Sequence, residues 1–226
     1  MSRKKIKNPL IKRIPKEIIG DWKKYLVVFL FLVLTIGFVS GMYVANDSML
    51  TSADEGVSKY KQEDGHFELK DKADSELVTA IESGEVKTAP DKKDSDSSKT
   101  PVTLYENFYR NETEDYDADG KKDGTIRVYT KTRDINLACL IEGSFPQNED
   151  EIAVDRMHAD NVGMKVGDTI KVSGKEFEVS GLIAYVNYST LHEKKTDMMF
   201  DAIKFDVAMV TQDGFDRLHK SIHYTY

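Results

Sequence analysis

Cysteine is almost absent from this sequence: Cys139 is the only one in 226 residues. A single cysteine cannot form an intrachain disulfide bond, which excludes a small domain held together by several disulfides. Any folded part of the chain must therefore be stabilised by an apolar core.

Positive charge is scarce outside the N-terminus. Residues 1–24 contain nine lysines and arginines against two acidic residues, a net charge of +7, whereas the whole chain carries −7. The rest of the chain therefore carries −14. Because nucleic-acid binding needs a basic face that neutralises phosphates, we expect no nucleic acid among the partners.

Common catalytic motifs are also missing. The sequence has no Gly-x-x-x-x-Gly-Lys-Ser/Thr loop, no Gly-x-Ser-x-Gly and no His-Glu-x-x-His. His192 and Glu193 begin the zinc pattern, but Thr196 stands where the second histidine is required. His219 and His223 could share a helix face, but they lack a third ligand. We therefore expect no enzyme, no catalytic residues and no cofactor.

One long uncharged segment is present, residues 25–46. Thirteen of its 22 residues are Leu, Ile, Val or Phe. As a helix it spans about 33 Å, enough to cross the hydrocarbon core of a membrane. A buried helix of a soluble protein is one alternative. A cleaved signal peptide is another, although its apolar region is ordinarily shorter, about 7–15 residues.

The charges beside this segment predict its orientation. Basic residues before a membrane span favour the cytoplasmic side. We expect three parts: a cytoplasmic basic tail at 1–24, a transmembrane helix at 25–46 and an extracytoplasmic domain at 47–226. Apolar residues at helical spacing predict that the tail is amphipathic and lies on the lipid surface, the alternative being a solvated tail.

The outer region mixes helix and strand signals, which predicts an α+β fold with no regular βαβ repeat. Residues 48–60 could prolong the membrane helix as a stalk, and residues 84–101 form a polar surface insertion. Strands are expected at 65–70, 102–109, 125–129, 151–154, 169–172, 176–179, 182–184 and 205–210. Helices are expected at about 75–83, 156–161 and 213–219.

Local signals fix several of these boundaries. Asp155 is suited to begin a helix as its N-cap, and Gly163 is suited to end it. Ser173 and Gly174 form the turn of the clearest predicted hairpin. Gly181 indicates a bulge or a sharp bend.

An acidic loop offers the one candidate metal site. Asp115, Asp117 and Asp119 alternate before Gly120, and Asp123 follows. Oxygen ligands at alternate positions are typical of the first part of a calcium loop, but Ile126 occupies the position of its closing Glu. The alternative is a solvated hairpin tip rich in turn residues.

Taken in order, these segments resemble the FtsX-like permease family of ABC transporters, whose N-terminal half includes a MacB-type extracytoplasmic core domain. Three stretches of the sequence carry the likeness. They are Trp22-Lys23-Lys24-Tyr25 leading to Gly41-Met42-Tyr43-Val44, then residues 123–129 with 140–146, and then residues 150–155, 162–170 and 177–183.

The resemblance implies a subunit in the plasma membrane of a bacterium. It implies an ATPase subunit as partner, together with the remaining permease helices or a second permease copy in the lipid bilayer. The chain would be an N-terminal portion, incomplete at its C-terminus, that couples ATPase motion to the outer domain for export or mechanotransmission. The competing interpretations are a complete single-pass surface protein that binds a ligand or partner, and a secreted metal-dependent protein.

Overall fold

The computed structural model describes residues 13, 19–84, 101–188, 190–194 and 196–226. Most of the amphipathic tail predicted at 1–24 and most of the insertion predicted at 84–101 lie outside these residues. The chain forms two compact units, Met1–Glu55 and Gly56–Tyr226.

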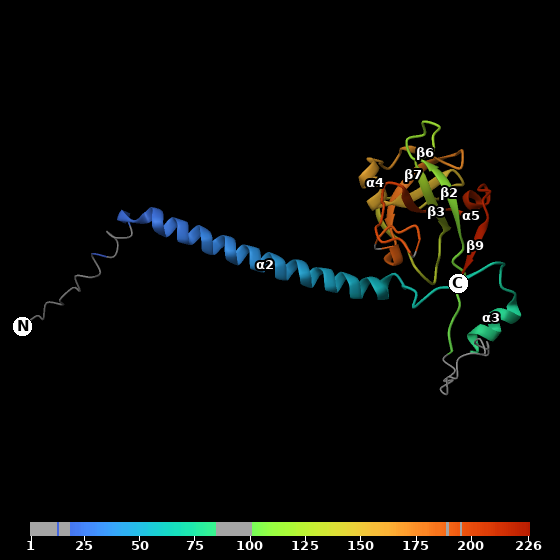
Figure 1. Ribbon diagram of the computed structural model, residues 1–226, viewed down its shortest axis with the longest axis horizontal. Coiled ribbons are helices and arrows are strands. Elements are labelled where there is room, and N and C mark those ends of the chain that lie inside the picture. The colour runs from blue at the N-terminus through green and yellow to red at the C-terminus, as the bar shows by residue number, and fades with distance from the viewer. Residues whose placement is uncertain (1–12, 14–18, 85–100, 189, 195) are drawn as a thin grey trace, which may run out of the picture. The chain divides into compact units, whose positions relative to one another are not determined.

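The first unit is dominated by helix α2 (Trp22–Lys59), the long blue helix of Figure 1. It is the one helix among the described residues that is long and apolar enough to cross a membrane. Its most apolar window has a mean hydropathy of 2.4, and no residue of that window is buried. At about 1.5 Å per residue the helix is roughly 57 Å long, nearly twice a hydrocarbon core. This helix is compatible with membrane anchoring, and it runs through the predicted stalk as far as Lys59.

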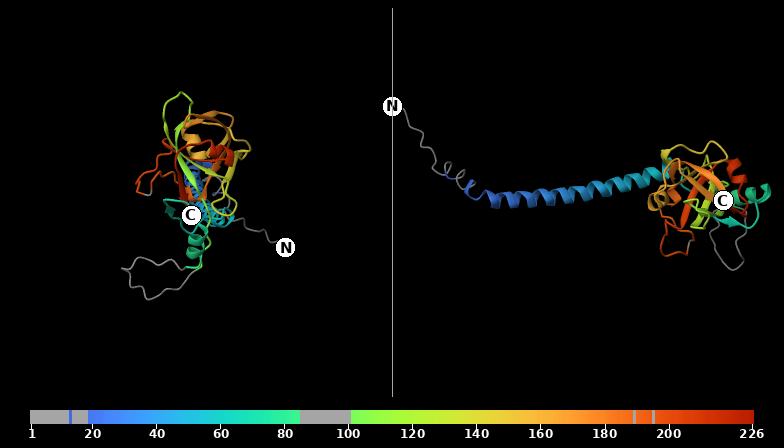
Figure 2. Two further views of the ribbon diagram at one scale, coloured as in Figure 1. Left: turned by 90° about the vertical axis from the view of Figure 1, so that its right-hand side faces the viewer. Right: turned by 90° about the horizontal axis from the view of Figure 1, so that it is seen from above.

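The second unit is a mixed α/β domain built on a barrel-like sheet (Figures 1 and 2). Six strands pair in a closed ring, in the order β2, β3, β8, β5, β7, β6 and back to β2. The β3–β8 and β5–β7 pairs are parallel and the other four pairs are antiparallel. The ring strands are β2 (Tyr109–Asp115), β3 (Gly124–Thr130), β5 (Glu151–Asp155), β6 (Thr169–Val172), β7 (Lys175–Ala184) and β8 (Phe205–Val210).

Three further strands and three short helices make up the rest of the described part of the domain. Strand β4 (Cys139–Gly143) pairs with β7, and β1 (Glu68–Leu69) pairs with β9 (Ile222–Thr225), which joins the ring through β2. The helices are α3 (Ser75–Glu82), α4 (Arg156–Val162) and α5 (Gln212–Asp216), and a 3-10 turn follows β7 at Val186–Tyr188.

Two apolar clusters fill the domain because side chains alternate between the two faces of each strand. On β8, Ala208 and Val210 belong to one cluster, while Phe205, Val207 and Met209 belong to the other. The first cluster takes residues from five of the six ring strands and from α4 and α5, so it fills the ring. The second packs outside the ring and includes Tyr185, Leu191 and Ala202. Strand β8 is consequently buried along its whole length.

A close backbone approach explains the bulge predicted at Gly181. The β5–β7 register slips beside it, between Ile152 and Ala153, and the β4–β7 register also slips nearby. A Cβ atom on Gly181 would collide with the carbonyl oxygen of Ser144, and one on Gly143 with the carbonyl oxygen of Ser180. Gly143 has a φ of +73°. These two positions therefore require glycine.

Most local predictions are confirmed. Asp155 caps α4, and Gly163 ends it with a left-handed φ of 78°. The helix expected at about 75–83 is α3, and Asp74 is its N-cap. The hairpin of β6 and β7 has the expected turn, with Val172 opposite Lys175. The broad expectation of an apolar helix followed by a domain that mixes helices and strands is also confirmed.

Three predictions are wrong, and two strands were not predicted. Residues 102–108 form no strand, and β2 begins at Tyr109 and runs into the segment predicted as acidic loop. The last helix ends at Asp216 rather than near 219, and β4 and β9 were not predicted. Strands β2, β4 and β9 form because pairing with distant segments overrides weak local propensity. Residues 102–108 have strand propensity, but no described strand pairs with them.

Candidate functional site

The segment that follows α2 is fastened to the loop before β4. The backbone N–H of Asn136 donates to the carbonyl of Lys61 at 2.9 Å, and the N–H of Leu137 donates to that of Tyr60 at 2.8 Å. The hydroxyl of Tyr60 lies 2.9 Å from Sγ of Cys139. This contact raises the pKa of the Tyr60 hydroxyl, and burial adds to the rise.

Asn136 is the centre of this junction, which we define as residues 60–63 with residues 133–139. Its side-chain oxygen accepts from the N–H of Glu63 at 3.1 Å, and its amide nitrogen donates to the carboxylate of Glu63. Asn136 is only 1% exposed and has a φ of +46°, a conformation that Asn tolerates better than most residues. The junction is thus a specific structure and not a loose linker.

The segment that follows residues 60–63 pairs with the last described strand. Phe67 and Tyr226 exchange two backbone hydrogen bonds, of 3.0 and 2.9 Å, and β1 pairs antiparallel with β9. The Tyr226 hydroxyl also accepts from the N–H of Ala73 at 2.9 Å. The first segment of the domain and its last strand therefore run side by side.

Next to the junction is a cavity of about 540 Å³. Its walls come from the segment before β1, from the outer face of β2 and β3, and from the loop after β7. The lining residues are Glu63, His66, Glu68, Asn107, Tyr109, Asn111, Arg127, Tyr129, Asn187, Tyr188, Thr190, His192, Glu193, Lys194 and Thr225.

Arg127 is the main fixed cation of the cavity. Its guanidinium donates to Asn111 at 2.9 Å, to the Tyr188 hydroxyl at 3.0 Å and to the carbonyl of Glu193 at 3.0 Å. It also lies 4.4 Å from the ring centroid of Tyr109. Burial lowers the pKa of Arg127, but the neighbouring tyrosines more than offset this, so the group stays charged.

The acidic and phenolic groups around Arg127 are paired with each other. The hydroxyls of Tyr129 and Tyr188 are 2.6 Å apart. Burial raises the pKa of Tyr109 to about 12, so its hydroxyl is neutral and donates to Glu68 at 3.2 Å. Burial also raises the pKa of Glu68, but the hydrogen bond and charge of His223, the hydrogen bond of Tyr109 and the charge of Arg127 together outweigh it, and the net pKa is lowered.

A second polar group lies inside the ring of strands. Glu114, His158 and Asp206 are each 0% exposed, and one ligand atom from each lies within 4.8 Å of the others. Nδ1 of His158 faces the carbonyl of Ala202 at 2.8 Å, which directs Nε2 toward Glu114. Three residues that could hold a metal are therefore gathered in the barrel, from β2, α4 and β8.

Charge within the barrel group is balanced without a metal if His158 is protonated. Burial lowers the pKa of His158, but Asp206 and Glu114 together outweigh it and raise the pKa to about 9. Burial raises the pKa of the Asp206 carboxyl. A protonated His158 beside one ionised carboxylate balances the buried charge without a metal.

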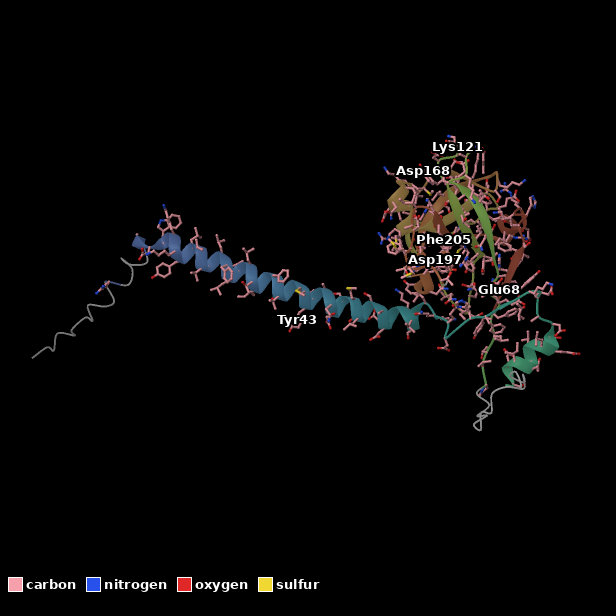
Figure 3. The ribbon with its side chains drawn as sticks, in the orientation of Figure 1. Tyr43, Glu68, Lys121, Asp168, Asp197 and Phe205 are labelled. Carbon is pink, nitrogen blue, oxygen red and sulfur yellow. The ribbon has the colours of Figure 1, made fainter. Side chains whose placement is uncertain are left out.

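The four aspartates predicted as a weak metal site lie at the turn between β2 and β3, where Figure 3 labels Lys121. The structure gathers Asp115, Asp117 and Asp123, with one carboxylate oxygen of each within 4.8 Å of the others. Asp119 is instead paired with Lys121 at 2.5 Å. Ile126, which occupies the position of the missing calcium ligand, is buried in the barrel core.

The histidine patterns do not form sites among the described residues. His223 lies on β9, where its ring stacks on Tyr109 at 4.6 Å and contacts Glu68, while His219 is exposed outside any helix. The prediction that these two residues could share a helix face is therefore wrong. His192 lines the cavity.

Sequence reasoning missed both the cavity and the barrel group, because their members come from distant segments. Comparison of the chain with protein-family models and with curated proteins finds no match.

Proposed function

We propose that this chain is the N-terminal part of a permease subunit resembling the FtsX-like ABC transporter family, with a MacB-type core as its outer domain. Its N-terminus would be cytoplasmic and residues 47–226 extracytoplasmic, in the plasma membrane of a bacterium. An ATPase subunit and further permease helices, or a second permease copy, would complete the machine.

One observation carries the proposal: α2 continues without a break from its apolar segment to Lys59, and the next residues are fastened to the domain through Asn136. A helix moves as a rigid body, so a displacement of its membrane segment is delivered at its far end. The junction would pass that displacement to the loop before β4. A flexible linker would absorb it.

The pairing of the first strand of the domain with its last strand also supports the proposal. Because Phe67 and Tyr226 are hydrogen-bonded neighbours, a segment following β9 would leave the domain next to the segment that follows α2. Such an arrangement suits a domain inserted between membrane helices.

Two measurements on native membranes test the proposal. Affinity purification of the tagged chain should recover an ATPase subunit, whereas an unrelated tagged single-pass protein should not. A reporter enzyme fused after Tyr226 should be active only outside the cytosol. Absence of an ATPase, or activity of the reporter in the cytosol alone, would overturn the assignment.

A stalk variant separates coupling from assembly. Ala53 lies in α2 beyond the apolar segment, and Ala53→Pro should break the helix there at a cost of about 3 kcal/mol. The ATPase should still co-purify with this variant, but the export or mechanotransmission that the ATPase drives should be lost. Ala53→Leu, which keeps the helix, is the matched control, and equal activity of the two variants would contradict rigid transmission.

The cavity favours a second candidate function, a single-pass surface protein whose outer domain binds a polar ligand. This function needs no ATPase and no coupling through the stalk. Full activity of the Ala53→Pro variant would favour it over the permease.

A further inference from the structure

We propose that the turn between β2 and β3 is a calcium site in which Asp115, Asp117 and Asp123 supply carboxylate oxygens. We call residues 115–123 the aspartate hairpin. This proposal does not depend on the permease assignment.

The spacing of ligands is the first support. Asp115, Asp117 and Asp123 occupy positions one, three and nine of the hairpin, and Gly120 occupies position six. A calcium loop uses oxygen ligands at positions one, three and nine and a glycine at position six for its sharp turn. Gly120 has a φ of +92°, which other residues rarely adopt.

The hairpin brings its three carboxylates together without the closing ligand that the sequence lacks. In a helix–loop–helix site the chain continues as a helix, and a glutamate at position twelve closes the coordination shell. Here the chain returns as β3, with Glu114 opposite Gly124, and the return brings Asp123 back to Asp115 and Asp117. Three carboxylates from one short turn thus converge without that residue.

A buried carboxylate oxygen without a partner supports the site independently of the ligand spacing. Asp115 is only 7% exposed, and its Oδ2 accepts from the N–H of Gly120 at 2.9 Å. Its Oδ1 is buried and has no hydrogen-bond partner among the residues that the structure describes. Leaving a buried carboxylate oxygen unpaired is costly, and a cation bound between the three side chains would satisfy it.

The surrounding charges leave room for a cation. Among the described residues, Asp115, Asp117 and Asp123 form no ion pair, because Lys121 is paired with Asp119 and the amine of Lys171 donates to the carbonyl of Ala118. Asp117 is exposed and Asp123 half-buried, so an ion reaches the group from solvent.

The ligand chemistry selects calcium. All the ligand atoms are hard oxygens, and a turn can provide the six to eight irregular positions that Ca²⁺ accepts from carboxylates, carbonyls and water. Mg²⁺ demands a near-ideal octahedron and gives up water reluctantly. Affinity should fall in the range of extracellular calcium modules, about 10⁻⁴ to 10⁻³ M.

The test is calcium titration of the full chain in detergent micelles, in a buffer with physiological KCl to screen diffuse attraction. Calorimetry should show saturable binding, and Tm should rise with Ca²⁺ but much less with Mg²⁺. Tb³⁺ supplies a direct probe, since Tyr116 lies within the hairpin and can sensitise its luminescence. Asp117→Asn and Asp123→Asn should each weaken Ca²⁺ binding about tenfold or more.

Asp123→Asn retains a side-chain oxygen for the N–H of Tyr116, so the fold should survive. Asp71→Asn removes the same charge from an exposed position elsewhere and should leave binding unchanged. No heat and no change in Tm up to about 10 mM Ca²⁺, or equal binding by Asp123→Asn and the wild type, would overturn the proposal.

Discussion

Nε2 of His158 lies 3.3 Å from Oε1 of Glu114 at a place in the barrel where neither side chain is exposed. Two groups that water would ordinarily solvate thus depend on each other and on Asp206. Removing one member leaves the others buried and uncompensated, so the group should control how stability responds to pH.

The first prediction concerns that response. The folded-state pKa of His158 is about 9, above its ordinary value of about 6.5. Its contribution to stability is therefore complete below about pH 6.5 and lost as pH rises through about 9, a change of roughly 3 kcal/mol. The raised pKa of Asp206 acts with the same sign. Denaturant unfolding of the full chain across this pH window should show the fall.

His158→Gln should reduce this fall between pH 6.5 and 9, leaving the part that Asp206 contributes, and lower stability by roughly 3–5 kcal/mol, because two buried acids lose their partner. His219→Gln changes an exposed histidine and should retain the wild-type profile. An unchanged profile in His158→Gln would show that another group is responsible.

The second prediction concerns the close approach at the bulge. Gly181→Ala should destabilise the domain by roughly 2–4 kcal/mol, because the new methyl group meets the carbonyl oxygens of Ser144 and Glu142. Gly65→Ala meets nothing within 4 Å and should change the free energy of unfolding by less than about 0.5 kcal/mol. Similar free energies of unfolding for the two variants would mean that β7 and the segment at Ser144 can move apart to accept the methyl group.

The third prediction concerns the junction. Asn136→Gly keeps the left-handed backbone but deletes both side-chain bonds to Glu63, at a cost of about 1–3 kcal/mol. Trypsin should then cut faster after Lys61. Asn161→Ala, which loses one bond to the carbonyl of Met157 in α4, is the control and should leave that cleavage rate unchanged.

The fourth prediction concerns the cavity. A lysine cannot reproduce the three-way hydrogen bonding and ring stacking of Arg127, so Arg127→Lys should cost roughly 2–4 kcal/mol and alter the near-UV circular dichroism of its tyrosines. Arg156→Lys changes an exposed ion pair with Asp160 and should cost less than about 1 kcal/mol. Equal costs would show that Arg127 is replaceable.

What could be read from the sequence was mainly local. The cap at Asp155, the turn at Ser173 and Gly174, and the bulge at Gly181 each follow from the chemistry of neighbouring residues. Strand β2 could not be found this way, because Glu112 and Glu114 are poor strand formers whose burial depends on Ser173, Lys220 and His158.

The candidate sites were likewise predictable only where their residues are close together in the sequence. The aspartates of one turn were visible as a pattern, but the role of Asp123 depends on the hairpin that returns it to Asp115. The barrel group unites residues 114, 158 and 206, and only the closed ring brings them together. Arg127 gave no signal, since a charged residue inside an alternating strand reads as solvent-facing.

Because the six ring strands form a closed sheet, local opening of the domain should begin at the strands outside the ring. A ring offers no free row of amides to solvent or to another chain, whereas β4 and β1 end the described sheet and each has one neighbour. Backbone protons of β8 should therefore exchange with deuterium only through global opening, and those of β4 through local opening. The domain has no intrachain disulfide, and its closed ring limits aggregation because it leaves few free strand edges.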